Sequence, residues 1–320
     1  MITRRKFNQL AGAALASLPL SGSTAFTSFS TKYKIGVQLF TIPKLVENDL
    51  KGTLKMVSEI GYKEVEFFGP YPFSATETIE RWKDIAYKLG FAKNAFYGFR
   101  LEEVKQMCKD FNLKTPSAHF DLISLRKNMD PAMEAFASLG TKYVVIPTLN
   151  NLDERDSADD YRKLADEFSG LGEKMKSYGI KLVYHNHGYE HASMNGEVPL
   201  DILLSRCDSR YVKFELDIFW MTAAGVNPVD FLKKYPGKFK LMHVKDAVEP
   251  VRFSGDGGTP DQWMALFSKM TDPGKGVFDI KGIIQAARTS GVEHFFLERD
   301  LAPDPQATLR NAYQYLSSIK

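Results

Sequence analysis

Four short polar clusters follow apolar runs in the second half of the chain, and their residue types suit metal chemistry. They contain imidazoles and carboxylates, the nitrogen and oxygen donors that hold Mn²⁺, Mg²⁺, Zn²⁺ or Co²⁺ in proteins. Each cluster comes directly after a segment that is typical of a buried strand. If those strands are parallel and close into a barrel, their carboxyl ends meet at one mouth, and the clusters can surround one divalent ion. The clusters are 185–190 (HNHGYE), 215–217 (ELD), 243–246 (HVKD) and 298–300 (ERD).

The alternation of side chains along a strand indicates which of these residues act together. His185 and His187 are two residues apart, so they point to the same side of their strand, and the same holds for His243 and Lys245. The two histidines are candidate general bases, and Lys245 would lose basicity beside a divalent ion and could then move protons. The structural alternatives are a hydrogen-bonded histidine pair at a strand end and an ordinary surface lysine.

Asp217 and Glu298 are the carboxylates that end predicted strands. A carboxylate in such a position is costly to bury unless a cation or hydrogen-bond donors match it. Both are therefore candidate metal ligands. Asp217 could instead cap the helix that follows it, and Glu298 could form a salt bridge.

Polar residues also end the earlier predicted strands. Gln38, Glu66 and His119 would line the same mouth, where they could donate and accept hydrogen bonds with a polyol substrate. Trp220 follows the 215–217 cluster and could offer its face to a sugar ring, although an aromatic residue is as readily explained by packing.

The chain as a whole predicts a (β/α)8 barrel in one domain, residues 33–320. Segments with apolar residues three and four apart alternate with the strands, and several end at Gly, which is typical of helix C-caps. An open doubly wound sheet would normally show a Gly-rich phosphate turn after its first strand, and none is present. The segment Glu249–Val277 reads as a long loop with a short amphipathic helix around Trp263–Met270, placed to act as a lid. The predicted strands are Tyr33–Phe40, Glu64–Phe68, Thr115–His119, Tyr143–Pro147, Lys181–His187, Val212–Asp217, Lys240–Lys245 and His294–Glu298.

Residues 1–30 have the order of an export signal. Thr3-Arg4-Arg5-Lys6-Phe7 precedes a modestly apolar stretch from Leu10 to Leu20, which resembles the twin-arginine pattern, and the first 30 residues contain no Asp or Glu. The apolar stretch is well short of the ~20 residues that a membrane span needs. We therefore expect an exported, periplasmic protein without a membrane span in its mature form. A disordered basic tail is the alternative.

The charge balance argues against a nucleic-acid partner. The 320 residues carry 42 basic and 39 acidic side chains, and removal of Arg4, Arg5 and Lys6 with the signal leaves 39 of each. Binding to nucleic acid normally requires a basic excess on one face. The two cysteines, Cys108 and Cys207, are not spaced as metal ligands. A small carbohydrate is the expected partner, and self-association into a homo-oligomer is compatible with the sequence.

The order of motifs GVQLFT, VEFFG, SAHF, YHNHGYE, ELDIFW, HVKD and LERD resembles the sugar phosphate isomerase/epimerase group of xylose-isomerase-like TIM barrels, from about residue 33 to 318. The resemblance implies one divalent metal, commonly manganese, with Asp217, His243 and Glu298 as ligands. Many relatives have Glu where this chain has His185, so either His185 or Glu190 is the fourth ligand. A third carboxylate would better neutralise a divalent ion, which favours Glu190.

This resemblance implies a metal-dependent isomerase or epimerase that acts through an enediolate. Loss of a β-substituent from the same intermediate would instead make the protein a dehydratase or a 3-keto-glycoside β-eliminase. The residues are also compatible with a metal-dependent hydrolase or with a sugar-binding barrel without turnover. Phosphorylated sugars are scarce outside the cytoplasm, so an exported enzyme is expected to use a free sugar, keto-sugar or keto-glycoside. The DNA-repair branch of the group uses three zinc ions, which six histidines and a neutral mature chain do not favour.

Overall fold

Eight parallel strands close into a barrel, as the sequence predicts. The structure is a computed structural model that describes residues 33–91 and 96–319. Each strand pairs with its neighbours in sequence order, and parallel bridges from Glu64 to Lys114 and from Phe67 to Ala118 close the ring between β2 and β3. An open doubly wound sheet is thereby excluded. The barrel strands are β1 (Ile35–Gln38), β2 (Glu64–Glu66), β3 (Ser117–His119), β4 (Tyr143–Ile146), β5 (Lys181–His185), β6 (Val212–Asp217), β7 (Phe239–Val244) and β10 (His294–Leu297).

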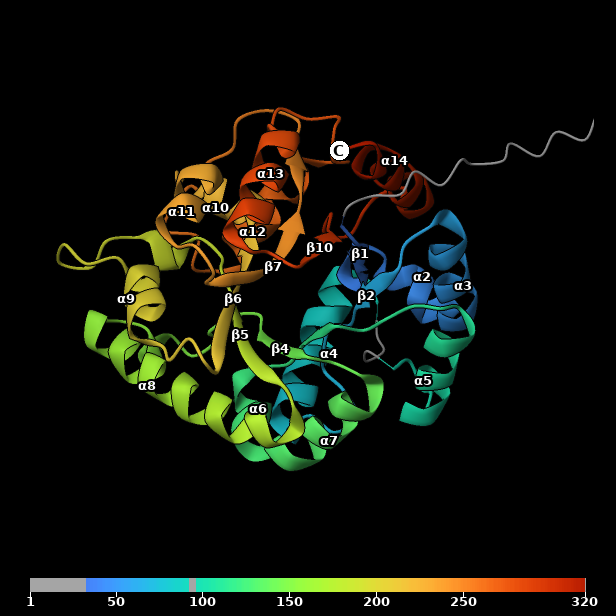
Figure 1. Cartoon of the computed structure of the whole chain (residues 1–320), viewed down its shortest axis with the longest axis horizontal. Helices are drawn as coiled ribbons and strands as arrows, with labels where there is room; N and C mark the ends of the chain where they lie inside the picture. Colours follow the sequence, from blue (N-terminus) through green and yellow to red (C-terminus); the bar gives the residue numbers. More distant parts are fainter. Residues whose placement is uncertain (1–32, 92–95, 320) are drawn as a thin grey trace, which may run out of the picture.

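Helices surround the barrel on its outside (Figure 1). Neighbours in the ring contact one another, among them α14 with α3, α3 with α5, α5 with α7, α8 with α9, and α11 with α13. The predicted helical segments all lie in this set. The longer helices are α3 (Leu50–Ile60), α4 (Thr76–Leu89), α5 (Leu101–Asp110), α7 (Met129–Leu139), α8 (Ala158–Met175), α9 (Pro199–Arg206), α11 (Pro228–Lys234), α13 (Ile280–Ser290) and α14 (Pro305–Ser318), and the shorter ones α2 (Pro43–Asn48), α6 (Leu122–Lys127) and α10 (Ile218–Ala223).

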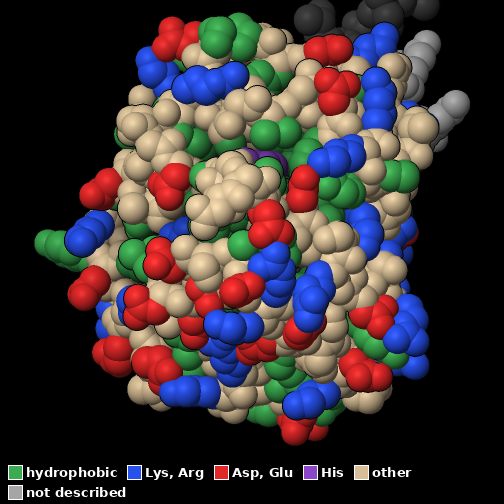
Figure 2. Space-filling view, turned by 90° about the vertical axis from the view of Figure 1, so that its left-hand side faces the viewer, with side chains coloured by type: hydrophobic (Ala, Val, Ile, Leu, Met, Phe, Trp, Pro, Cys, Tyr) green, Lys and Arg blue, Asp and Glu red, His purple; other side chains and the backbone are tan. Residues whose placement is uncertain are grey.

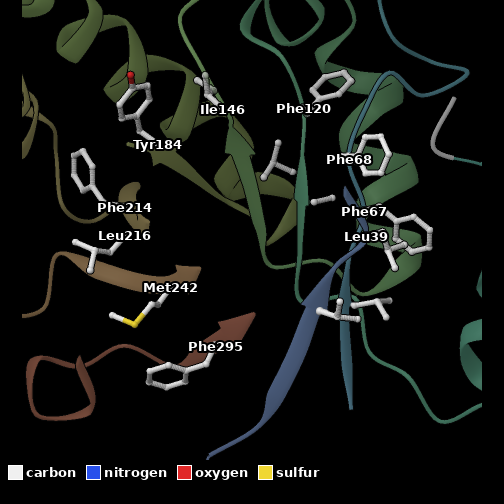
Figure 3. Close-up of a cluster of buried hydrophobic side chains, with 14 of the residues drawn as sticks. Leu39, Phe67, Phe68, Phe120, Ile146, Tyr184, Phe214, Leu216, Met242 and Phe295 are labelled. Atoms are coloured by element: carbon white, nitrogen blue, oxygen red, sulfur yellow. The ribbon is translucent and has the colours of Figure 1, made fainter. Parts of the chain in front are cut away.

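Alternation along the strands separates the main core from the barrel interior. The apolar side chains that pack between strands and helices include Phe214 and Leu216 of β6 and Met242 of β7 (Figure 3). The residues between them, such as Glu215 and His243, belong instead to the polar interior of the barrel, where they contact each other. The burial that stabilises the fold therefore also fixes which side chains face inward.

An apolar layer fills the barrel beneath its polar mouth. It consists of five buried residues from five strands: Tyr143, Val145, Val183, Leu241 and Phe296. Gly36 of β1 makes room for this layer, because a Cβ at that position would lie 2.4 Å from Cδ1 of Phe296. The packed interior means that substrate can reach the polar residues only from the carboxyl end of the strands.

The long segment after β7 folds over this end of the barrel. Its β8 (Asp246–Ala247) and β9 (Met270–Thr271) pair antiparallel, and α12 (Pro260–Phe267) lies between them. The helix confirms the predicted one, whereas the strand pair was not predicted. Asp246 organises the segment, because its carboxylate accepts hydrogen bonds from the backbone amides of Ala247, Gly274, Gly276 and Phe278.

The molecular surface carries both signs of charge. Acidic and basic side chains are interspersed over the face in Figure 2, without a large area of one sign. Among the described residues, the helices are too short or too polar to cross a bilayer. The predicted signal, residues 1–30, lies outside the described residues.

Gly36→Ala should destabilise the barrel, because Phe296 is fully buried and cannot yield to the added methyl group. We expect a loss of about 1–3 kcal/mol in the free energy of unfolding, measured by urea titration. Gly170→Ala in α8 is the matched control, since its Cβ would meet no atom within 4 Å. The control should gain about 0.5–1 kcal/mol. Equal stability of the two variants would contradict this view of the interior.

Candidate metal centre

The four strand ends singled out in the sequence bring four potential ligands together. His185 ends β5, Asp217 ends β6, His243 lies near the end of β7, and Glu298 directly follows β10. One donor atom from each lies within 4.8 Å of the others, and all four residues are buried. We call these four residues the outer group.

The donor atoms of the outer group converge on one point. Nδ1 of His243 lies 2.6 Å from Oε2 of Glu298 and 3.3 Å from Nε2 of His185. Oδ2 of Asp217 lies 3.6 Å from the same His185 nitrogen and 3.8 Å from Nδ1 of His243. Two imidazoles and two carboxylates are thus aimed at one small volume.

The two oxygens of Asp217 have different roles. Oδ1 accepts hydrogen bonds from the amides of Phe219 and Trp220, both at 2.9 Å, and so caps α10. Oδ2 is buried and accepts no hydrogen bond from the described residues. The helix cap and the ligand position, which the sequence offered as alternatives, therefore occur together.

His243 separates two clusters of carboxylates. Its Nδ1 faces Glu298, whereas its Nε2 lies 2.7 Å from Oε2 of Glu66 and 3.2 Å from Oε1 of Glu215. Glu66, His119, Glu215 and His243 form a second buried set with donor atoms within 4.8 Å of one another, which we call the inner group.

Gln38, Glu66 and His119, predicted to bind substrate at the mouth, instead pack against His243. Gln38 and Glu66 are fully buried, and His119 is 8% exposed. Nε2 of Gln38 donates to Glu66 at 2.8 Å, and Nε2 of His119 lies 3.0 Å from Glu215. Their hydrogen-bonding groups are directed into the protein, because inward-facing residues on adjacent staggered strands meet below the rim.

Glu190 does not belong to the outer group, contrary to the preference expressed for it over His185. Its carboxylate accepts hydrogen bonds from the hydroxyl of Tyr184 at 2.6 Å and from the amide of His187 at 3.0 Å. The short 3₁₀ turn Tyr189–His191 holds the carboxylate there. Burial raises the pKa of Glu190 to about 7, so the geometry favours His185 as the fourth donor.

Lys245 lies at the rim, among three carboxylates. Its Nζ is 2.7 Å from Oδ2 of Asp300 and 2.9 Å from Oε2 of Glu298. It is also 3.1 Å from Oδ2 of Asp217. Burial alone would lower the pKa of Lys245, but these carboxylates outweigh burial and raise it, so the ammonium stays protonated. The expected loss of basicity is thus absent from this arrangement, and Lys245 acts as a cation and hydrogen-bond donor.

His187 is the neutral imidazole nearest the rim. Its ring lies 4.4 Å from that of Trp263 and 5.9 Å from that of Trp220, measured between centroids. Burial lowers the pKa of His187 well below its ordinary value. Trp220 is itself only 3% exposed, with Nζ of Lys245 4.8 Å from its ring centroid. His187 therefore retains a free lone pair at neutral pH, and Trp220 forms part of its wall.

The donor set fits a divalent cation. The imidazole and carboxylate donors of the outer group suit Mn²⁺, Zn²⁺ or Co²⁺. Burial alone would raise the pKa of Asp217 and of Glu298, but Lys245 and the nearby histidines outweigh it, so both carboxylates stay ionised. The unpaired Oδ2 of Asp217 points at the centre of the group. A bound cation would satisfy this oxygen and offset the buried negative charge.

The comparisons with known proteins agree with this architecture. A family model described as xylose isomerase-like TIM barrel matches residues 54–319. The chain belongs to this family. An inosose dehydratase of Lacticaseibacillus casei is 22% identical over 301 residues, which cover 83% of this chain and 95% of that protein.

Two solved structures show that the similarity extends over the whole barrel. A sugar phosphate isomerase/epimerase from Parabacteroides distasonis superposes with a TM-score of 0.68 at 22% identity, covering 95% of this chain and all of that one. The 3-keto-D-glucoside 4-epimerase of E. coli superposes with a TM-score of 0.59 at 18% identity, covering 89% and 99%. At these identities the superpositions establish the fold alone.

Two residues of this xylose isomerase-like barrel belong to the site although the sequence analysis assigned them no role. Glu215 joins the inner group, and Asp300 pairs with Lys245. Burial raises the pKa of Asp300 to about 7. The alternation that relates His185 to His187 could have identified Glu215, because it lies two residues before Asp217 on the same side of β6. Asp300 follows the end of its strand, where alternation no longer indicates direction.

Replacing outer-group residues should weaken metal binding. Asp217→Asn keeps a helix cap but loses the charge, and Glu298→Gln changes the charge alone. Each should lower the affinity for Zn²⁺ at least about 100-fold, since loss of a residue that merely supports a ligand costs 10–100-fold. Equilibrium dialysis with metal analysis measures the effect.

His185→Ala and Glu190→Gln decide the fourth position. We expect a loss like that of Glu298→Gln for the first and wild-type affinity for the second. The reverse result would restore Glu190 as the ligand and contradict the geometry.

Proposed function

We propose that this protein is a metal-dependent sugar isomerase or epimerase that acts through an enediolate. The observation that carries the proposal is the outer group with the neutral His187 beside it. His185, Asp217, His243 and Glu298 would hold one divalent ion, for which we propose manganese. When bound, the ion would polarise the substrate carbonyl and stabilise the negative charge of the enediolate.

The chain's own residues supply the proton transfer. His187 is neutral and two residues from His185 on the same strand end, so it can remove the proton next to the carbonyl. Return of that proton to the neighbouring carbon isomerises the sugar, and return to the opposite face epimerises it. The protonated Lys245 can donate a hydrogen bond to a substrate oxygen. Trp220 and Trp263 enclose His187 and limit its contact with water.

A β-elimination at the same site is the second candidate, supported by the similarity to an inosose dehydratase. It needs the same proton abstraction, followed by loss of a hydroxyl or glycosyl group from the next carbon. The two candidates share His187 as base and differ only in what leaves the intermediate. Product analysis separates them, because elimination yields an unsaturated product and isomerisation does not.

The substrate class follows from the proposed compartment. The twin-arginine pattern supports export to the periplasm, where a free sugar, keto-sugar or keto-glycoside is a better candidate than a sugar phosphate. Similarity to a 3-keto-D-glucoside 4-epimerase supports keto-glycosides in particular. Lys replacement of both Arg4 and Arg5 should leave the protein in the cytoplasm, measured by cell fractionation, and unchanged export would contradict the signal.

Hydrogen exchange tests the proposed chemistry directly. Protein loaded with Mn²⁺ should incorporate carbon-bound deuterium into keto-sugars or 3-keto-glycosides in D₂O, detected by NMR. His187→Asn should reduce incorporation about 10²–10⁴-fold, the usual contribution of a general base. His191→Asn is the matched control, since His191 packs against Phe231 in α11.

Absence of exchange across the panel, with metal bound, would contradict the enediolate scheme. It would favour the hydrolase or the sugar-binding barrel without turnover. Wild-type exchange in the His187 variant would transfer the role of base to another residue.

A further inference from the structure

The two ring nitrogens of His243 face different partners, and this difference has a cause within the barrel. Nε2 lies 2.7 Å from Oε2 of Glu66 and 3.2 Å from Oε1 of Glu215. An ionised carboxylate can only accept a hydrogen bond, so Nε2 must carry the hydrogen. The neutral imidazole then has its lone pair on Nδ1, which is the nitrogen that faces Asp217 and Glu298.

Glu66 is held in place by a chain of contacts that begins at the backbone. The amide of Phe40 donates to Oε1 of Gln38 at 3.1 Å, and this fixes which end of the Gln38 side chain is the amide nitrogen. That nitrogen donates to Oε2 of Glu66 at 2.8 Å. The same oxygen accepts from His243. The orientation of His243 is therefore set from β1 and β2, on the neighbouring side of the barrel.

Glu215 is held in the same way from β3. Oε2 of Glu215 lies 3.0 Å from Nε2 of His119, a ring that is stacked on His243 with 5.4 Å between centroids. Burial alone would raise the pKa of Glu66, but His119 and His243 outweigh it and keep the carboxylate ionised. The residues below His243 thus form a closed hydrogen-bonded set.

We propose that Glu66, oriented by Gln38 and assisted by the Glu215–His119 pair, is a positioning residue that fixes His243 with Nδ1 toward the outer group. Glu66, Gln38 and His119 then support a metal ligand from below and do not touch the substrate. This inference rests on the proposed metal site. Carboxylate partners of this kind fix the tautomer and ring orientation of a metal-binding histidine, and their loss typically costs 10–100-fold in metal affinity.

The barrel contains a matched control for this chemistry. Glu64 lies two residues before Glu66 on β2, is also fully buried, and accepts from Nδ1 of His294 at 2.7 Å. It faces the opposite end of the barrel and contacts no residue of the outer group among the described residues. A replacement of Glu64 therefore removes a buried Glu–His pair of the same geometry without disturbing His243.

The test compares Glu66→Leu and Glu66→Gln with Glu64→Leu and Glu64→Gln. Affinity for Zn²⁺ is measured by competition with a chelator, the absorption spectrum of bound Co²⁺ reports ligand geometry, and urea titration reports stability. Glu66→Leu should bind Zn²⁺ about 10–100-fold more weakly and shift the Co²⁺ spectrum. Glu66→Gln should lose less, because an amide oxygen still accepts from Nε2. Both Glu64 variants should bind like the wild type, even where their stability falls.

Three outcomes would overturn the inference. Wild-type affinity and spectrum in Glu66→Leu would show that His243 needs no such support, and an equal loss in Glu64→Leu would assign the effect to stability. Two ions per wild-type chain, with one lost in Glu66→Leu, would make the inner group a second metal site. In all three cases a loss of affinity in Glu298→Gln would leave the proposed metal centre intact. Failure of the wild type to bind metal would overturn the proposed function as well.

Discussion

Negative charge buried inside the barrel mouth is the constraint on which this structure depends. Removing a carboxylate from water costs several kcal/mol unless cations and donors compensate it, and the mouth holds several such groups around a single ammonium. The histidines divide accordingly. Burial alone would lower the pKa of both His119 and His243, but the neighbouring carboxylates outweigh it and raise them, His119 to about 9. The buried carboxylates are those of Glu66, Glu215, Asp217, Glu298 and Asp300.

This constraint links the fold to the proposed function. Asp217 caps α10 with one oxygen and offers the other to the outer group, so the same side chain starts a helix and binds a ligand. His243 likewise lies between the carboxylates that hold it and those that would share its metal. Because such residues have two sets of partners, the barrel orients its candidate ligands before any ion binds, which lowers the cost of binding. The apolar layer below keeps the donors at the rim, and the segment folded over the mouth encloses them.

The sequence was sufficient to predict the barrel because its strands combine apolar outward faces with polar inward residues at their ends. The same alternation identified Asp217, His243 and Glu298, which the structure brings together. It failed for Glu190, since the position of a residue five places beyond a strand depends on a tight turn and on the hydroxyl of Tyr184. Gln38, for example, was placed at a strand end correctly, but its depth in the mouth depends on the stagger between strands, which local sequence does not encode.

Anomalous diffraction from crystals soaked in Mn²⁺ would test the proposed metal centre most directly. We predict a single peak bonded to Oδ2 of Asp217, Nδ1 of His243, Nε2 of His185 and a carboxylate oxygen of Glu298, at the roughly 2.0–2.2 Å typical of such nitrogen and oxygen ligands. A peak centred on Glu66 and Glu215, a peak at Glu190, or no peak at saturating Mn²⁺ would contradict this placement.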